Sequence, residues 1–401
     1  MFPAVSGILS VLIWIYLLWG RGSFWQVSKL KAFPQTGPKN GEHAPCNVAV
    51  VVPARNEVDV IDRSITSLLR QDFRGSLHVF LVDDSSQDGT AQAAVRAAEK
   101  AGASQSLTVI TGEPLPPGWS GKLWAVHQGL EKARERFPLH GGSGDFYLLT
   151  DADVVHSRSN VATLVSIADA GGYDLASIMV RLHCESLAEK FLIPAFVFFF
   201  FQIYPPSWIA QRKKAVAGAA GGCILIRPKA LERAGGIAAI RNEIIDDCAL
   251  AKAVKTDGGT VWLGLADSDS ATSVRPYGTF AEIETMISRT AFRQLNHSAL
   301  VLIAALAGLV VTYLVPMLLL FSRSPFPIAM GAIAWLMMTC AYLPMIRYYR
   351  LNAAWALALP FIALFYSGAT LHSAVKFWLG RGGEWKGRVQ DRKSAEAETS
   401  H

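Results

Sequence analysis

The sequence predicts an α/β domain with a doubly wound, mostly parallel sheet, joined to transmembrane helices at both ends of the chain. Three observations support this prediction. Strand-like and helix-like segments alternate between residues 46 and 295, as they do in parallel sheets covered by helices on both faces. Long apolar stretches precede and follow that region. Only 17% of the 401 residues are charged, against about 25% in ordinary soluble domains.

The N-terminal segment, residues 1–22, is predicted to be a transmembrane anchor. Its stretch 4–20 contains no charged residue and has about the minimum length of a membrane span. A cleaved signal peptide is the alternative, but the segment lacks a basic start and a small-residue cleavage site. Arg21, Lys29 and Lys31 follow the stretch and favour a cytoplasmic C-terminal end. We therefore expect a multi-pass protein of the inner (cytoplasmic) membrane whose α/β domain faces the cytosol.

The α/β region begins with a valine-rich strand, predicted at 47–54, whose apolar run indicates burial on both faces. A helix is predicted at 57–71, because its apolar residues recur at the spacing of one helical face. The other expected elements continue this alternation. They are strands at 77–84, 107–112 and 145–153 and helices at 89–102 and 122–136. In such a sheet the carboxyl ends of parallel strands share one edge, where ligands bind.

One apolar segment interrupts the α/β region. Residues 187–209 contain the run "FLIPAFVFFFFQIYPP", which is short for a membrane span and ends in two prolines. A full crossing would also put the two halves of the domain on opposite sides of the membrane. We therefore predict a membrane-interfacial segment. A buried core helix is the alternative.

The C-terminal region, residues 298–377, contains three apolar stretches that are each long enough to span a membrane, at 298–321, 326–346 and 353–377. Three spans after one N-terminal anchor would place the tail, residues 378–401, outside the cell. The tail and the residue just before it are basic, which favours the cytoplasm. The basic residues are Lys376, Arg381, Lys386, Arg388, Arg392 and Lys393. One of the three stretches is therefore expected to be re-entrant or interfacial, and the sequence leaves open which one.

The charge balance restricts the classes of partner. A formal net charge of +6 and a pI of about 9.0 suit anionic lipid headgroups or substrates that carry phosphate. No cluster of Lys and Arg alternates with aromatic residues, so we predict no nucleic-acid partner. The five cysteines are scattered without a CxxC pair, which indicates reduced thiols and argues against zinc sites and disulfides.

Acidic side chains gather where the predicted strands end. Asp83 and Asp84 follow the second strand, and Asp151 and Asp153 follow the fourth. Each group alone has a simpler explanation, because Asp also favours turns and helix caps. Together, at one edge of one sheet, they predict a ligand site. The oxygen atoms of an Asp-x-Asp pair suit Mg²⁺ or Mn²⁺, which would also bind substrate phosphates.

The order of motifs along residues 46–295 resembles that of the family 2 glycosyltransferases, which have the GT-A (nucleotide-diphospho-sugar transferase) fold. The motifs are "VVPARNE", "VDDSSQDGT", "GWSGKLWA", "DAD", "GG…GG" and "IIDDCALA". Each is weak alone, but their combination is specific. The apolar ends and the stretch "GEPLPPGWSGKLWA" most resemble the hopene-associated glycosyltransferases of hopanoid biosynthesis. Ceramide glucosyltransferases are a related family.

The resemblance implies roles for the residues that match these motifs. They are Pro53, Arg55 and Glu57 in the nucleotide pocket, Asp83 and Asp84 at the uracil and ribose, Lys122 beside the diphosphate, and Asp151 with Asp153 in the DxD motif. Asp153 is the expected direct ligand of Mg²⁺ or Mn²⁺. A first-turn lysine that is merely solvated is the alternative for Lys122, although a cation beside a pyrophosphate is physically apt.

The resemblance also implies a general base. The second acid of the family's acidic pair matches Asp247, and Asp246 stands where the family usually has Glu, so both remain candidates. Helix capping is the simpler explanation for two acids at a helix start. Gly221 and Gly222 precede a predicted strand and either line the site near the sugar or acceptor or simply form a turn. Arg293 matches the arginine of the family's (Q/R)xxRW motif, but no tryptophan follows it, which favours transfer of one sugar over chain extension.

The predicted function is therefore that of a membrane-bound inverting glycosyltransferase. It would move one sugar from a nucleotide-diphosphate sugar, expected to be a UDP-sugar, to a lipid hydroxyl such as that of a hopanoid. A polyprenyl-phosphate or ceramide-type sugar transferase is the alternative within the same class. A non-catalytic membrane protein that senses nucleotide sugars is the alternative from another class.

Overall fold

The computed structural model describes residues 2–30, 46–137, 145–267 and 270–380, and the short strands β10 (Glu384–Trp385) and β11 (Arg388–Val389). The chain forms two compact units. The sheet unit comprises Leu30–His183 and Trp208–Arg275, and the helix unit comprises Met1–Lys29, Cys184–Ser207 and Pro276–His401. Lys31 and most of the predicted basic tail lie outside the described residues.

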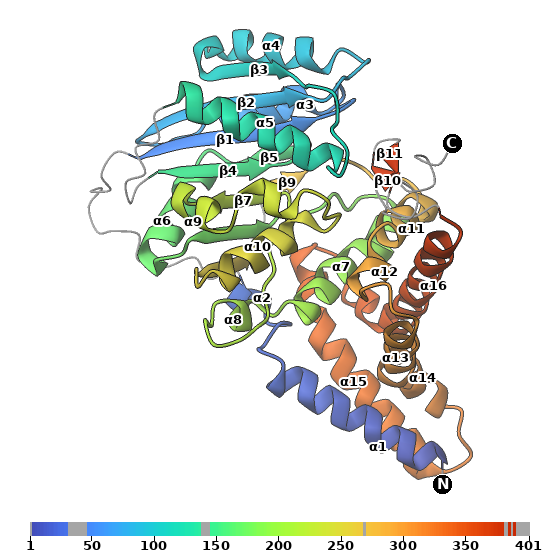
Figure 1. The fold of residues 1–401 in the computed structure, drawn as a ribbon. Coiled ribbons are helices and arrows are strands. Elements are labelled where there is room, and N and C mark those ends of the chain that lie inside the picture. The colour runs from blue at the N-terminus through green and yellow to red at the C-terminus, as the bar shows by residue number, and fades with distance from the viewer. Residues whose placement is uncertain are drawn as a thin grey trace. The chain divides into compact units, whose positions relative to one another are not determined.

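The sheet unit is built on a seven-stranded sheet with the order β3-β2-β1-β4-β7-β6-β8 (Figure 1). Its strands are β1 (Asn47–Ala54), β2 (Ser76–Asp83), β3 (Leu107–Thr111), β4 (Phe146–Thr150), β6 (Leu175–Met179), β7 (Cys223–Ile226) and β8 (Val261–Leu265). Only β7 runs antiparallel to its neighbours, β4 and β6. The predicted doubly wound, mostly parallel sheet is thus confirmed. The second, two-stranded sheet pairs β5 (Val154–His156) with β9 (Ala271–Ser273).

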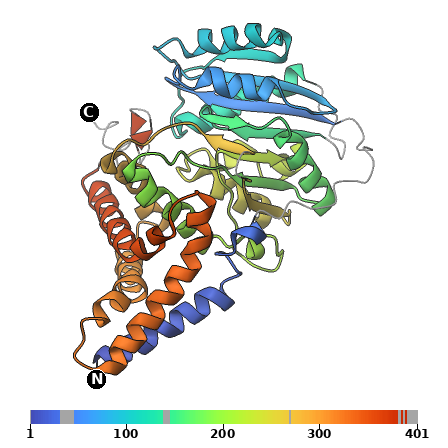
Figure 2. The ribbon, with the colours of Figure 1, turned by 180° about the vertical axis from the view of Figure 1, so that it is seen from behind.

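The helices of the sheet unit cover both faces of the sheet. They are α3 (Ile61–Leu69), α4 (Thr90–Ala101), α5 (Gly121–Arg136), α6 (Asn160–Gly171), α9 (Pro228–Arg233) and α10 (Asp246–Thr256), with the 3-10 helices η2 (Ser104–Ser106) and η3 (Ile237–Ile240). Helices α3 and α5 lie on opposite faces, as the views in Figures 1 and 2 show.

Strand β1 lies at the centre of this packing. Val48, Val50 and Val52 share a hydrophobic core with apolar residues of α3, α4 and α6. The next residue in the alternation, Val51, faces α5, where a Cβ on Gly129 would lie only 2.5 Å from its side chain. Glycine therefore permits the close approach of α5 to the sheet. Complete burial of each valine is worth about 1.5–3 kcal/mol, which explains the run of valines.

The register of the sheet brings the carboxyl ends of its central strands into line. Ala54 of β1 pairs with Asp83 of β2, and Asp83 pairs in turn with Thr111 of β3. Strand β4 ends at Thr150, one residue before the DAD motif. The first acidic group and the second therefore follow strands that end at one edge, as the sequence predicted.

Within the described residues, five helices are long and apolar enough to cross a membrane. They are Phe2–Gly20, Leu187–Ile209, Ala299–Leu319, Pro325–Tyr348 and Ala353–Trp378. In chain order, these spans correspond to α1 (Phe2–Ile15) with η1 (Tyr16–Gly20), α7 (Leu187–Ile203) with α8 (Pro206–Ile209), α13 (Ala299–Leu309) with η4 (Val310–Leu314) and α14 (Val315–Leu319), α15 (Pro325–Tyr348), and η5 (Ala353–Ala358) with α16 (Leu359–Trp378). The short helices α2 (Val27–Leu30), α11 (Phe280–Ser288) and α12 (Ala291–Gln294) complete the described set.

Proline and tryptophan act together where α13 passes into α14. Pro316 has no N–H group, so it cannot donate to the carbonyl of Thr312, four residues earlier. The helix widens there into the π-helical turn η4, and the indole of Trp14 on α1 donates to Thr312 O over 2.9 Å. Helices α1 and α15 run side by side in this unit (Figure 2), and a Cβ on Gly7 would lie 2.9 Å from Met330.

The chain on either side of two apolar segments shows which elements they connect. The segment that contains α7 leaves the sheet after β6 and returns before β7, and these two strands are hydrogen-bonded neighbours. The end of α16 packs beside the residues that precede α13, because Phe292 N–H donates to Ser373 Oγ over 3.0 Å. Its beginning lies against the middle of α15, where Trp335 Nε1 donates to Leu357 O over 3.3 Å.

Candidate active site

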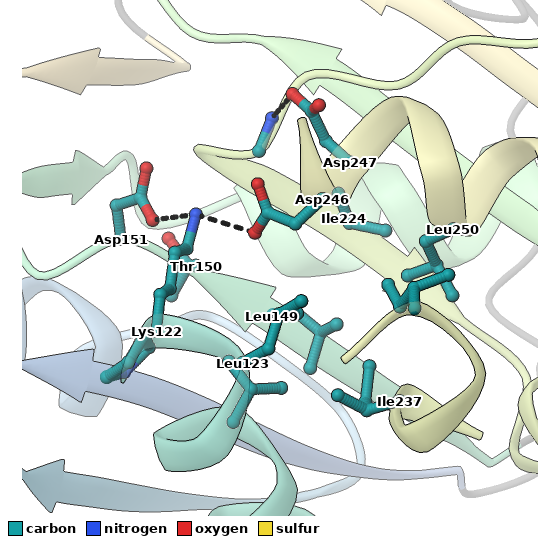
Figure 3. Close-up of a pocket in the computed structure, with 14 residues that line it drawn as sticks. Lys122, Leu123, Leu149, Thr150, Asp151, Ile224, Ile237, Asp246, Asp247 and Leu250 are labelled. Atoms are coloured by element: carbon teal, nitrogen blue, oxygen red, sulfur yellow. Dashed lines mark hydrogen bonds and ion pairs between the residues drawn. The ribbon is translucent and has the colours of Figure 1, made fainter. Parts of the chain in front are cut away.

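A pocket at the carboxyl edge of the sheet collects residues from distant parts of the sheet unit (Figure 3). Its lining comes from the end of β1, the start of α5, the end of β4, the turn before β7, η3 and the start of α10. The lining residues are Pro53, Lys122, Leu123, Val126, Leu149, Thr150, Asp151, Gly221, Ile224, Ile237, Ile240, Asp246, Asp247 and Leu250. The pocket therefore brings Lys122 and three aspartates together in a lining that is otherwise mostly apolar.

Lys122 links two of the predicted acidic groups. Its Nζ atom lies 2.9 Å from Asp151 Oδ1 and 3.1 Å from Asp246 Oδ2, as the dashed lines in Figure 3 indicate. Burial alone would lower the pKa of Lys122, but the charges of Asp151, Asp246 and Asp247 outweigh it and raise that pKa. The ammonium group therefore stays protonated. We refer to Lys122, Asp151 and Asp246 as the lysine cluster.

The start of α5 fixes the position of Lys122. Ser120 caps the helix by accepting from Leu123 N–H, and its own N–H donates to Arg241 O over 2.7 Å. Lys122 is thus held in the first helical turn, next to the turn that precedes α10. Burial raises the pKa of Asp151, although the ammonium of Lys122 opposes the rise.

Asp247 is held by backbone donors. Its Oδ2 accepts from Gly221 N–H over 2.8 Å, and its Oδ1 accepts from Cys248 N–H over 2.7 Å. Burial and then the charge of Asp246 raise the pKa of Asp247 to about 6, while Lys122 and the two N–H groups oppose the rise. A carboxylate of this kind takes up and releases a proton near neutral pH.

The two predicted glycines differ in what they contact. A Cβ on Gly221 would lie 3.3 Å from Asp247 Oδ2 and 3.4 Å from Lys122 Nζ, so glycine leaves space at the centre of the pocket. A Cβ on Gly222 would instead face Val180, and Gly222 is not among the lining residues. Its carbonyl accepts from Thr150 Oγ1 over 2.8 Å.

The two aspartates of the DxD motif separate. Asp151 belongs to the lysine cluster, whereas Asp153 Oδ2 accepts from Ser273 Oγ over 2.7 Å and lies 3.4 Å from Arg275 Nε. Arg275 Nη2 also binds Glu57 Oε2 in a close ion pair. We refer to Arg275, Glu57 and Asp153 as the arginine cluster.

The remaining predicted residues lie at the ends of β1 and β2. Arg55 Nη1 donates to Asp84 O over 2.8 Å and lies 3.4 Å from Asp84 Oδ2. Asp83 Oδ1 accepts from Ser86 N–H over 3.1 Å. Pro53 reaches the pocket itself. Arg293 lies on α12 of the helix unit and is not among the pocket-lining residues.

Sequence reasoning did not single out several residues of this site. Arg275 and Ser273 follow or belong to β9, a strand of three residues that carries no periodic pattern. Thr150 and His156 were also missed; Thr150 Oγ1 and His156 Nε2 lie 3.0 Å apart. Burial lowers the pKa of His156 to about 4, so its ring is neutral and supports the turn structurally. Arg275 reaches the site through the pairing of β5 with β9, which is a tertiary contact that sequence patterns do not show.

Among the acidic residues of the site, Asp153 has the arrangement that suits a divalent cation. No group of three or more His, Cys, Asp or Glu residues in the described part of the chain forms an all-protein metal cage. Asp153 Oδ1, however, receives no hydrogen bond from any described residue, while Oδ2 is oriented by Ser273 and Arg275. One oriented carboxylate suits Mg²⁺ or Mn²⁺ whose other ligands are water and substrate phosphates.

Comparisons with known proteins give the class of this fold and site. Residues 49–235 match the family model described as glycosyl transferase family 2. Among solved structures, the mannosyltransferase PcManGT from Pyrobaculum calidifontis, in complex with GDP-Man and Mn²⁺, is similar with a TM-score of 0.50 and 19% identity over 93% of this chain and 98% of that one. No curated protein sequence matches the chain significantly.

Two further similar structures have lower scores. Staphylococcus aureus TarS in complex with UDP-GlcNAc is 14% identical over 85% of this chain and 95% of its own, with a TM-score of 0.36. Glucosyl-3-phosphoglycerate synthase from Mycobacterium tuberculosis is 17% identical over 62% of this chain and 79% of its own, with a TM-score of 0.37. The protein is a glycosyltransferase with the GT-A fold. More particularly, residues 49–235 are the part of the chain that matches glycosyl transferase family 2.

Proposed function

We propose that this protein is a membrane-bound inverting glycosyltransferase that moves one sugar from a nucleotide-diphosphate sugar, a UDP-sugar, to a lipid hydroxyl. A hopanoid is the candidate acceptor, on the resemblance of the motifs and apolar ends. One observation carries the proposal: Lys122, Asp151, Asp246 and Asp247 face a single pocket at the carboxyl edge of the sheet. This edge is where open α/β sheets bind their ligands.

The donor would bind across the ends of β1 and β2. Arg55 and Asp84, which contact each other there, would hold the base and ribose together with Asp83. Glu57 would support this pocket, and Pro53 would form part of its wall. Lys122 would lie beside the diphosphate, because a partly buried cation in the first turn of a helix is suited to phosphate.

A divalent cation, Mg²⁺ or Mn²⁺, would be held by Asp153, with Asp151 remaining on Lys122. PcManGT was solved with Mn²⁺ and GDP-Man, which supports a test of both metals and of GDP-sugars. When bound, such a cation neutralises the charge that develops on a departing diphosphate. Lys122, which lines the pocket, would add a second positive charge beside the diphosphate.

Asp247 is the proposed general base. Its pKa of about 6 leaves it largely ionised at pH 7.5 and still basic enough to take a proton from a hydroxyl as the bond to the sugar forms. Gly221 and Cys248 N–H groups fix the carboxylate in the pocket. One displacement by the acceptor oxygen at the anomeric carbon inverts the configuration there. Asp246 would hold Lys122 and would not accept the proton.

The helix unit supports a lipid acceptor. Many of its large apolar side chains are exposed on the outer faces of α1, α13, α15 and α16, as expected for contact with lipid. Residues 187–209 would lie at the membrane interface, because a complete crossing of α7 would separate the paired strands β6 and β7. The catalytic unit would face the cytosol at the inner membrane.

The same contacts support a three-crossing topology, made by α1, by α13 with α14, and by α15. The segment 353–377 would be re-entrant, so that the tail stays on the cytosolic side with its basic residues. A membrane-impermeant maleimide applied to intact cells should label Ser324→Cys, between α14 and α15, and spare Leu379→Cys, after α16. Labelling of both positions would show instead that α16 crosses.

The function itself is tested with purified full-length protein in detergent or nanodiscs. UDP-sugars and GDP-sugars are incubated with Mn²⁺ and extracted bacterial lipid, and products are followed by mass spectrometry and by release of nucleoside diphosphate. The proposal predicts a glycolipid and an equimolar nucleoside diphosphate. Binding without either product would favour a nucleotide-sugar sensor, and transfer to polyprenyl phosphate alone would favour the phosphate-acceptor alternative.

A further inference from the structure

The backbone of residues 273–275 is fixed beside the DxD motif. Strand β9 pairs antiparallel with β5, so that Ser273 lies opposite Val154. The next residue, Val274, donates its N–H to Asp153 O over 2.9 Å. The backbone just before Arg275 is therefore hydrogen-bonded to Asp153. Ser273 and Asp153 are 120 residues apart in the sequence.

The side chains complete this arrangement. Ser273 Oγ donates to Asp153 Oδ2 over 2.7 Å, and Arg275 Nε lies 3.4 Å from the same oxygen. The other end of the guanidinium binds Glu57. The side chains of Glu57 and Asp153 are 9% and 15% exposed, so both charges sit largely out of water. In the described part of the chain, nothing donates to Asp153 Oδ1.

We propose that Arg275, together with Ser273, is a positioning residue that presents Asp153 to the divalent cation. The inference rests on the proposed function, since it assumes that the cation binds at Asp153. The Ser273 hydroxyl donates to Oδ2, and the guanidinium lies 3.4 Å from the same oxygen, so that Oδ1 would be the atom that takes a ligand. Ligating carboxylates are commonly oriented by such hydrogen bonds, and loss of the orienting group typically costs about 10–100-fold in metal affinity or activity.

The guanidinium of Arg275 also reduces the repulsion between two neighbouring carboxylates. Glu57 and Asp153 are two carboxylates that share Arg275 as a cationic neighbour, and like charges so placed would otherwise repel each other. Arg275 offsets that repulsion. It does so as a planar fork whose Nε and Nη2 atoms reach different carboxylates, a geometry that the single ammonium of lysine does not reproduce.

Arg275→Lys is the informative variant, because it keeps the charge and removes the fork. Mn²⁺ binding to the full-length protein is measured by electron paramagnetic resonance with UDP or GDP present, and transfer is measured over a range of Mn²⁺ concentrations. We expect Mn²⁺ affinity to fall by about 10-fold or more, with kcat largely restored at saturating Mn²⁺. Ser273→Ala removes only the hydroxyl donor and should weaken Mn²⁺ binding in the same direction.

Arg233 provides a matched control on the surface of the same unit. It also bridges two carboxylates, with Nε 2.8 Å from Asp257 Oδ2 and Nη2 3.4 Å from Asp174 Oδ1. Arg233→Lys should leave Mn²⁺ affinity unchanged. Wild-type Mn²⁺ affinity in both Arg275→Lys and Ser273→Ala would overturn the inference alone. A wild-type protein that binds no Mn²⁺ with either nucleotide would count against the proposed metal site, and the inference would fall with it.

Discussion

The lysine cluster and the arginine cluster are built alike and differ in what they leave open. Each places one cation between two carboxylates from distant parts of the sheet unit. In the lysine cluster the ammonium lies within 3.1 Å of both partners and occupies the space between them. In the arginine cluster the guanidinium contacts Oδ2 of Asp153, and no described residue donates a hydrogen bond to Oδ1. The two aspartates of one DxD motif therefore have different partners.

This difference suggests a division of labour between the clusters. Lysine supplies a compact charge that is suited to contact a diphosphate directly, whereas arginine supplies a rigid fork that is suited to orient other groups. Asp247 stands outside both clusters, held by the N–H groups of Gly221 and Cys248. If the lysine cluster, the arginine cluster and Asp247 act independently, variants of each should change different measured quantities. The predictions begin with the largest expected effect.

The largest effect is expected at Asp247. Asp247→Asn removes the base and should lower kcat by about 10²–10⁴-fold, the usual contribution of a general base. Nucleotide affinity, measured by isothermal titration calorimetry, should change little, because the carboxylate binds backbone groups and not the lysine. Asp246→Asn is the matched neighbour and should lose less activity. The opposite ranking would assign the base to Asp246.

Lys122 is next in expected effect. Lys122→Met leaves Asp151 and Asp246 facing each other without their cation and removes a charge from the diphosphate. We expect kcat/KM for the donor to fall by about 10²-fold, comparable to loss of one preorganised donor at a site of developing charge. Steady-state kinetics measure this, with Lys132→Met, a surface lysine paired with Glu135, as the control. Equal activity in both variants would make Lys122 a merely structural residue.

The DxD motif offers the sharpest separation of the clusters. Asp153→Asn should weaken Mn²⁺ binding by at least about 10-fold, because the oriented carboxylate is lost. Asp151→Asn should retain Mn²⁺ binding and instead resemble the Lys122 variant in donor kinetics. Competition between Mn²⁺ and a fluorescent chelator measures both. If Asp151→Asn were the variant that loses the metal, the two clusters would not have separate tasks.

The smallest expected effect is the pH dependence of the wild-type protein. Burial raises the pKa of Asp247 to about 6, and only the ionised form accepts a proton. The kcat/KM value should therefore rise as pH increases through about 6 and stay level from there to pH 8. The step should be absent from the residual activity of Asp247→Asn. A step that persists in that variant would belong to another group.

The sequence predicted the edge of the sheet because simple rules determine it. Buried strands read as valine-rich runs, parallel strands end together, and Asp83, Asp84, Asp151 and Asp153 follow those ends. The same rules placed Lys122 at the start of a helix at that edge. These features depend on local pattern and on topology that repeats in α/β folds.

The partners of these residues were beyond the reach of sequence patterns. Arg275 reaches Asp153 because a three-residue strand, β9, pairs with β5, and a segment so short has no measurable periodicity. Asp151 and Asp153 likewise have different partners because Lys122 lies beside one and Arg275 beside the other. In the helix unit, hydropathy identified the apolar segments, but the contact of Ser373 with Phe292 could not be predicted from hydropathy.

The central claim is that one donor complex joins both clusters, with the metal on Asp153 and Lys122 on the diphosphate. It is tested most directly by a structure of the protein with Mn²⁺ and the nucleoside diphosphate product, with the metal located by its anomalous signal. The account predicts Mn²⁺ bonded to Asp153 Oδ1 and to phosphate oxygens, with Lys122 in contact with the diphosphate. Mn²⁺ bound between Asp151 and Asp246, in the place of the Lys122 ammonium, would contradict it.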